Sequence, residues 1–138
     1  MKSIALAAAL ALAAAPALAQ DEGVTATPVT SETATNSGQP ITLPQGPVEV
    51  TVTRVVIPAG TTLPVHKHPY PRYAEVETGR ILVMNLQTGT DREYGPGDFI
   101  VEAVGQWHTG AVISTTDVRL LVIDQHPPGE GNTVQRVE

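Results

Sequence analysis

The chain has 138 residues, of which 41% are hydrophobic and only 4% aromatic, and its 14 acidic and 8 basic side chains give a formal charge of −6. This length fits one domain, and the negative charge argues against a basic patch that binds nucleic acid or an anionic membrane. The absence of cysteine excludes disulfide scaffolds, cysteine-ligated zinc or iron–sulfur sites and thiol nucleophiles. Any chemistry therefore depends on other side chains.

The first 19 residues have the composition of a secretory signal peptide. Lys2 supplies a positive start, residues 4–15 are apolar, and residues 17–19 (Ala-Leu-Ala) form a small-x-small cleavage site before Gln20. The apolar stretch is shorter than the roughly 20 residues of a membrane-spanning helix. We therefore expect a periplasmic or secreted protein that does not bind to a membrane.

Residues 20–40 are rich in Thr, Ser, Glu, Pro and Gly and contain few large apolar side chains. Such a segment cannot bury enough apolar surface to offset the entropy that it loses on ordering. The composition therefore predicts a flexible leader over residues 20–40, followed by one compact domain over residues 41–138.

Short apolar segments separated by Gly- and Pro-containing turns make up this domain. Val48, Val50 and Val52 alternate with polar residues, which predicts a half-buried strand. The other strands that we expect lie at residues 73–76, 81–86, 99–104, 111–113 and 118–123. Because no segment after residue 40 has the sustained 3.6-residue apolar repeat of a helix, we predict an all-β sandwich or jelly-roll barrel.

Three of the four histidines have a spacing that suits a metal ion: His66 and His68, two residues apart, and His108. Residues i and i+2 of a strand point to the same face, so His66 and His68 can present two imidazole nitrogens to one point. A third histidine from a neighbouring strand completes a facial set, which leaves coordination positions open for substrate or water. The alternative is that these histidines are ordinary hydrogen-bonded or exposed residues on a polar face.

The glycines around the histidines resemble the two sequence motifs of the cupin superfamily. The ends of the first motif, G(x)5HxH(x)3-4E(x)6G, are matched by Gly60, His66, His68 and Gly79. The physical pattern agrees, because glycine tolerates the positive φ that tight turns between strands require.

The second motif, G(x)5PxG(x)2H(x)3N, has its spacing reproduced by Gly97, Gly105 and His108. With the strands on either side, the resemblance extends over about residues 41–126. It implies a double-stranded β-helix, the cupin jelly-roll barrel, with a divalent transition metal (Fe, Mn, Zn or Ni) inside.

The sequence departs from the first motif at the metal-binding glutamate. The six residues that the motif places before Gly79 are residues 73–78, so Arg72 stands in the glutamate slot. At an assumed distance of about 8 Å and an effective dielectric constant of about 20, Arg72 and a metal site of charge +2 would repel by about 4 kcal/mol. Glu75 is a nearby carboxylate, but by strand parity it points to the opposite face unless the loop at residues 69–71 shifts the register.

Three outcomes follow for the metal site. Arg72 turns outward and leaves three histidines and water, or it turns inward and holds an anionic substrate that bridges to the metal. The third outcome is loss of the metal. We favour the three-histidine site and assign Arg72 to substrate binding.

We expect Trp107 to pack on the strand face opposite His108, and His126 to be an exposed turn residue before Pro127.

These features predict a secreted protein that binds one divalent transition metal through His66, His68 and His108 and uses it on a small molecule. Dioxygenase, isomerase and lyase reactions all occur on this fold, so the fold alone does not select one. The alternative is a non-catalytic module that binds a small ligand or the metal itself. A further alternative is a structural domain that forms a homodimer through an edge strand.

Overall fold

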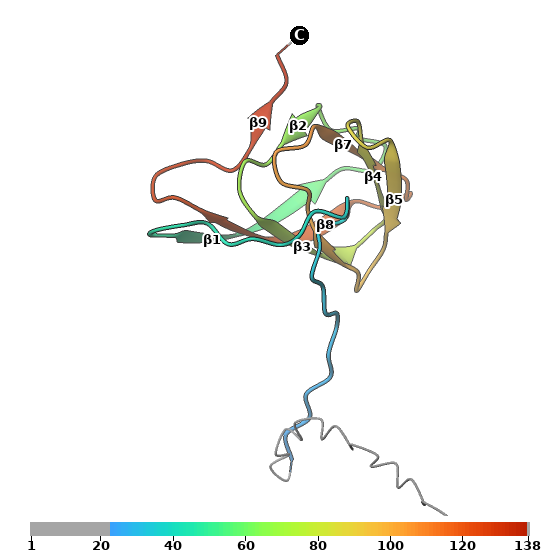
Figure 1. The fold of residues 1–138 in the computed structure, drawn as a ribbon. Helices are drawn as coiled ribbons and strands as arrows, with labels where there is room; N and C mark the ends of the chain where they lie inside the picture. Colours follow the sequence, from blue (N-terminus) through green and yellow to red (C-terminus); the bar gives the residue numbers. More distant parts are fainter. Residues whose placement is uncertain (1–22, 138) are drawn as a thin grey trace, which may run out of the picture.

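The computed structural model describes residues 23–137, so the expected signal peptide lies outside the described residues. Within this range the chain forms two antiparallel sheets and no helix. The first sheet has the order β1 (Glu49–Ile57), β8 (Val118–His126), β3 (Arg72–Thr78) and β6 (Phe99–Val101). The second has the order β5 (Thr90–Tyr94), β4 (Ile81–Asn85), β7 (His108–Val112), β2 (His66–Lys67) and β9 (Val134–Gln135). The sheets curve around one interior (Figure 1), and the predicted all-β jelly-roll barrel is confirmed.

The apolar core fills one end of the barrel. It consists of buried residues from both sheets: Ile57, Ala74, Val76, Ile81, Ile100, Val112, Val118, Leu120 and Val122. Along β8, the alternate buried residues change from Val118, Leu120 and Val122 to Asp124. Strand β3 runs antiparallel to β8, so its first residue, Arg72, is in register with Asp124, and its buried residues Ala74 and Val76 lie toward the apolar end. The interior of this sheet therefore turns polar at the end where Arg72 and Asp124 lie.

The five-stranded sheet also has an apolar end and a polar end. Strand β4 begins with buried Ile81 and ends with buried Asn85, and these residues are in register with Val112 and His108 of β7. His66 of β2 lies opposite His108 on the other side of β7. Both sheets thus place apolar residues at one end of the barrel and polar residues at the other, where the candidate site forms.

The alternation in β1 identifies a strand but not its buried face. Val50 and Val52 are 57% and 59% exposed on the outer surface, whereas Val55 and Ile57 pack at the core. The strand pleat then turns Thr51 inward, toward the polar end of the barrel. Burial of Val55 and Ile57 therefore decides which face of β1 points inward, and Val50 and Val52 at the other end of the strand point outward.

The expectation that His126 is an exposed turn residue is wrong. Strand β8 continues through His126, which is only 6% exposed. Its Nε2 lies 3.0 Å from the Thr51 hydroxyl of the paired strand, and its Nδ1 lies 3.0 Å from the Pro127 carbonyl oxygen. Because β1 and β8 pair over their whole length, the last residue of β8 stays inside the sheet.

Part of the expected leader contacts the barrel. The Asn36 amide donates to the Val101 carbonyl over 2.7 Å, and the Gln39 side chain forms two hydrogen bonds of 2.9 Å with the backbone of Val104. These contacts lie beside β6, an edge strand of the four-stranded sheet. The flexible leader over residues 20–40 and the boundary at residue 41 stay predictions. Among the described residues, no helix is long and apolar enough to cross a membrane.

Candidate metal centre

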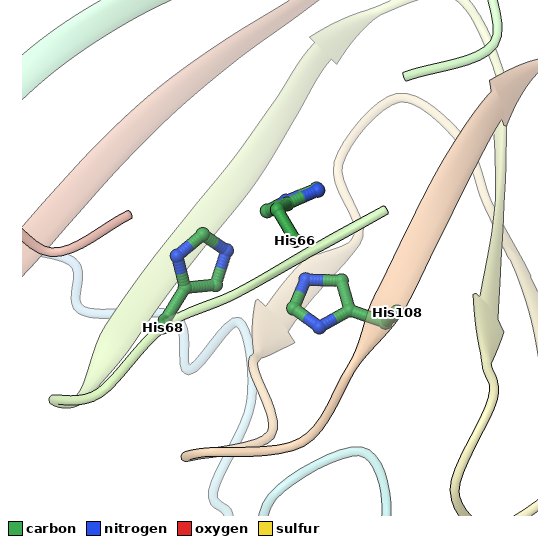
Figure 2. A group of neighbouring side chains, drawn as sticks. All are labelled: His66, His68 and His108. Carbon is green, nitrogen blue, oxygen red and sulfur yellow. The ribbon is translucent and has the colours of Figure 1, made fainter. Parts of the chain in front are cut away.

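Three histidine rings meet at the polar end of the barrel (Figure 2). Strand pairing places His66 of β2 beside His108 of β7, and His68 follows two residues after His66. The ring centroids lie 4.5 to 4.9 Å apart, and one ligand atom from each ring lies within 4.8 Å of the others. The structure therefore brings together the three histidines that the sequence pointed to.

Each ring is oriented by a hydrogen bond from Nδ1 to a backbone carbonyl oxygen. The distances are 2.8 Å from His66 to Pro64, 2.7 Å from His68 to Asn132 and 2.9 Å from His108 to Gln106. Because a carbonyl oxygen only accepts, Nδ1 carries the proton and Nε2 of the neutral ring carries a lone pair. This is the arrangement in which backbone groups hold metal-ligating histidines in place.

A carboxylate that sequence reasoning missed lies among these nitrogens. One oxygen of Glu102, Oε2, is 3.2 Å from Nε2 of His68 and 3.2 Å from Nε2 of His108. Glu102 follows β6 directly, and the pleat turns it to the same inner side as buried Ile100. A charged residue two positions after a core residue in a predicted strand is the signal that could have identified it.

The donor set fits a cation. His108 Nε2 is buried, and within residues 23–137 no side chain donates a hydrogen bond to it. Two imidazole lone pairs and a carboxylate oxygen, all acceptors when the rings are neutral, therefore face one another across 3.2 Å. A proton or a metal ion is needed to turn this arrangement from repulsion into attraction, and imidazole and carboxylate are both ligands of divalent transition metals.

The ionisation of these groups is strongly perturbed. Burial alone would raise the pKa of Glu102, but contact with His108 and His68 holds it well below its usual range. Burial alone would lower the pKa of His108, but the Glu102 carboxylate raises it. For His66 burial dominates, and the pKa falls from 6.5 to about 4. The carboxylate is therefore an anion at neutral pH, and His66 is a neutral ring.

Arg72 turns into the barrel and is neutralised there by a second carboxylate. Its Nε and Nη2 donate to the two oxygens of Asp124 over 2.7 and 2.9 Å. Its Nη1 lies 3.4 Å from His68 Nε2, so the guanidinium borders the histidines. The repulsion that we expected between Arg72 and a metal is reduced because Asp124 cancels its charge. Its assignment to substrate binding stays a prediction.

Asn132 joins the Arg72–Asp124 pair to the histidines. Its side-chain amide donates to Asp124 over 2.6 Å, while its backbone carbonyl accepts from His68 Nδ1. The same side chain accepts from the Tyr70 amide over 2.9 Å. Asn132 is 6% exposed and lies between β8 and β9, so the C-terminal segment of the barrel holds one of the candidate ligands.

A cavity of about 100 Å³ adjoins the site. The three histidines, Arg72, Glu102 and Thr109 form its polar wall, and aliphatic side chains from both sheets form most of the rest. This volume suits a few water molecules or a small organic molecule. Glu75, the alternative carboxylate, is exposed on the outer face of β3 and does not reach the site.

Comparisons with known proteins agree with this fold. A family model described as a cupin domain matches residues 53–124, and a search of curated proteins gave no match. The polyketide cyclase RemF from Streptomyces resistomycificus is similar at a TM-score of 0.54 and 21% identity, over 64% of this chain and 63% of that chain.

Two further solved structures resemble the barrel. The DMSP lyase DddQ from Ruegeria pomeroyi DSS-3 has a TM-score of 0.54 and 22% identity, over 62% of this chain and 42% of that one. An oxalate oxidase in complex with the substrate analogue glycolate has a TM-score of 0.52 and 26% identity, over 62% of this chain and 45% of that one. The chain spans less than two thirds of the length of each of these proteins.

Proposed function

Since the chain belongs to the cupin family, we propose that it binds one divalent transition metal through His66, His68 and His108. The observation that carries this proposal is the cluster of three histidines, in which one ligand nitrogen of each ring lies within 4.8 Å of the others and each Nδ1 is held by a backbone carbonyl oxygen. Iron, manganese, zinc and nickel all accept imidazole ligands. The burial that depresses the pKa of His66 also keeps this ring neutral, as metal binding requires.

We further propose that the metal acts on a small molecule held in the adjoining cavity. When bound, the metal would supply Lewis-acid polarisation of an oxygen or, if it is iron, redox chemistry with dioxygen. The chain itself contributes a mostly aliphatic wall that excludes water and a polar end formed by Glu102 and Arg72. The similar structures are named as a polyketide cyclase, a DMSP lyase and an oxalate oxidase, so this fold hosts enzymes. For this chain we propose a dioxygenase, isomerase or lyase reaction on a small molecule.

One observation favours a second function, non-catalytic binding of a small ligand or of the metal alone. Asp124 pairs with Arg72 through both carboxylate oxygens, so the cation that we expected to hold an anionic substrate already has a partner. This function predicts stabilisation by a ligand without turnover.

We propose the location from the sequence and the assembly state from the surface of the barrel. The signal-like residues 1–19 support export to the periplasm or medium. The exposed valines of edge strand β1 support a homodimer.

Metal analysis tests the metal proposal. The protein, purified without chelator, is expected to carry about one equivalent of a transition metal, and a His66→Ala/His108→Ala variant none. His126→Gln is the matched control, because it removes a buried histidine outside the cluster. A double variant that keeps the metal, with a melting profile like that of the parent, would overturn the three-histidine site.

Turnover separates the two functions. The metal-loaded protein is incubated with a panel of small carboxylates, carbonyl compounds and alcohols, and product formation is compared with that of His66→Ala. Activity of the parent above the variant supports catalysis. Thermal stabilisation by a compound that is never converted supports the binding module instead.

A further inference from the structure

We propose that Glu102 supplies the carboxylate ligand of this centre, from a different strand than the one that carries the glutamate of the family motif. The proposal rests on the proposed function, since it presupposes a metal on the three histidines. It adds a residue that no motif in the sequence marks.

The first argument is distance. Metal bonds to imidazole nitrogen and carboxylate oxygen are about 2.0–2.2 Å long, so adjacent ligand atoms lie about 3.0 Å apart in octahedral and about 3.4 Å apart in tetrahedral centres. Glu102 Oε2 is 3.2 Å from Nε2 of both His68 and His108. One oxygen therefore stands at ligand spacing from two candidate ligand atoms at once.

The second argument is the place of Glu102 in the barrel. The amide of Glu102 donates to the carbonyl of Arg72 over 3.0 Å, so position 102 is the cross-strand neighbour of position 72. Position 72 is where the first motif expects its glutamate. The candidate carboxylate of this chain thus stands directly after β6, beside the β3 position where the motif has its glutamate. It points to the same interior of the barrel.

The third argument is charge. Arg72 and Asp124 form a bidentate pair of zero net charge. Three neutral histidines and the Glu102 anion would then reduce the charge of a divalent ion from +2 to +1, as a glutamate at position 72 would. With Arg72 in that slot, the two carboxylates together restore the charge balance of the motif.

Cobalt(II) titration tests the proposal, because the visible spectrum of cobalt reports on its ligands independently of activity. The parent protein, freed of metal, is compared with Glu102→Gln, which has nearly the same shape and no charge, and with Glu102→Asp, which keeps the charge. Glu75→Gln on the outer face of β3 is the matched control. Dissociation constants are measured by competition with a chelator.

We expect Glu102→Gln to bind cobalt about 100-fold more weakly or worse and to shift the cobalt absorption bands, whereas Glu75→Gln changes neither. Glu102→Asp should recover part of the affinity. Parent-like affinity and spectrum in Glu102→Gln would overturn the ligand role of Glu102 and leave the three-histidine site standing. Weaker binding with an unchanged spectrum would also overturn it, because Glu102 would then be a counter-ion only.

A parent protein that binds no cobalt, nickel, zinc or iron would overturn the proposed function and this inference together. Circular dichroism and thermal melts of each metal-free variant show whether the barrel has folded. If Glu102→Gln fails to fold, the comparison rests on Glu102→Asp, whose shorter side chain should still shift the cobalt bands if position 102 is a ligand.

Discussion

Arg72 and Asp124 lie opposite each other on β3 and β8, and the guanidinium donates to both carboxylate oxygens over 2.7 and 2.9 Å. The pair stands at the boundary between the apolar core and the three histidines, and Asn132 donates a further hydrogen bond to Asp124. An arginine beside a cation site is tolerable only while this carboxylate is in place. The metal affinity of the site should therefore depend on a residue that touches no metal ligand directly.

Replacing Asp124 by Asn tests this dependence. The variant leaves the Arg72 charge uncompensated near His68, so we expect metal affinity to fall by about tenfold or more. Breaking a buried pair from one side should also lower the free energy of unfolding by about 3 kcal/mol. Chelator competition and urea denaturation measure the two effects.

The control for Asp124→Asn is the double variant Arg72→Gln/Asp124→Asn. Removing both charges should restore most of the metal affinity, because no unpaired cation remains. Parent-like metal affinity in Asp124→Asn alone would show that the Arg72 charge does not act on the site.

The buried ring of His66 makes the metal-free barrel sensitive to acid. Its pKa is about 4 in the folded protein against 6.5 in an exposed histidine, so between pH 6.5 and 4 the unfolded chain binds a proton that the folded chain does not. Stability is therefore present above pH 6.5 and is lost as the pH falls toward 4. In urea denaturation with chelator at pH 6.5 and 5, His66→Gln should lose less stability than the parent, and an equal loss would contradict the assignment.

Protons compete with metal first at His108, not at His66. The Glu102 carboxylate raises the pKa of His108, so protonation of this ring begins above the usual 6.5, while His66 stays neutral to about pH 4. Metal affinity should therefore already weaken at a pH above 6.5. The measurement is a series of competition titrations from pH 7.5 to 5, and constant affinity across this range would indicate that His108 is not a ligand.

Two motif glycines with the same backbone angle should differ in their tolerance of a side chain. Gly60 and Gly79 both have φ of +75°, but an added Cβ would meet nothing within 4 Å at Gly60 and would lie 2.6 Å from the Asp117 carbonyl oxygen at Gly79. We expect Gly60→Ala to cost about 1 kcal/mol, from backbone strain alone, and Gly79→Ala about 3 kcal/mol or more. Equal losses in urea denaturation would mean that β-strand packing at Gly79 adjusts without cost.

The sequence predicted six of the nine strands of the described residues, and the three histidines, because both are local patterns. It did not predict the short strands β2 and β9 or the polar strand β5, which lack an apolar alternation of their own. Two-residue periodicity and turn residues locate strands, and His66 and His68 share a face by pleat alone. The same patterns did not identify Glu102, because it reaches the site through the pairing of β6 with β3, which no local pattern encodes. They also misjudged His126, which stays buried because β8 pairs with β1 over its full length.

By itself, then, the sequence determined an all-β barrel of the cupin family with three histidines able to converge, since the spacing of glycines and histidines encodes turns and strand faces. Only the tertiary structure decided which face of β1 lies inside, which carboxylate stands beside the histidines, and how Arg72 is neutralised. The physical reason is that these outcomes depend on pairing between strands far apart in the chain. Arg72 contacts Asp124, which lies 52 residues later in the chain, and its carbonyl accepts a hydrogen bond from the amide of Glu102. No local sequence pattern specifies the register that brings these residues together.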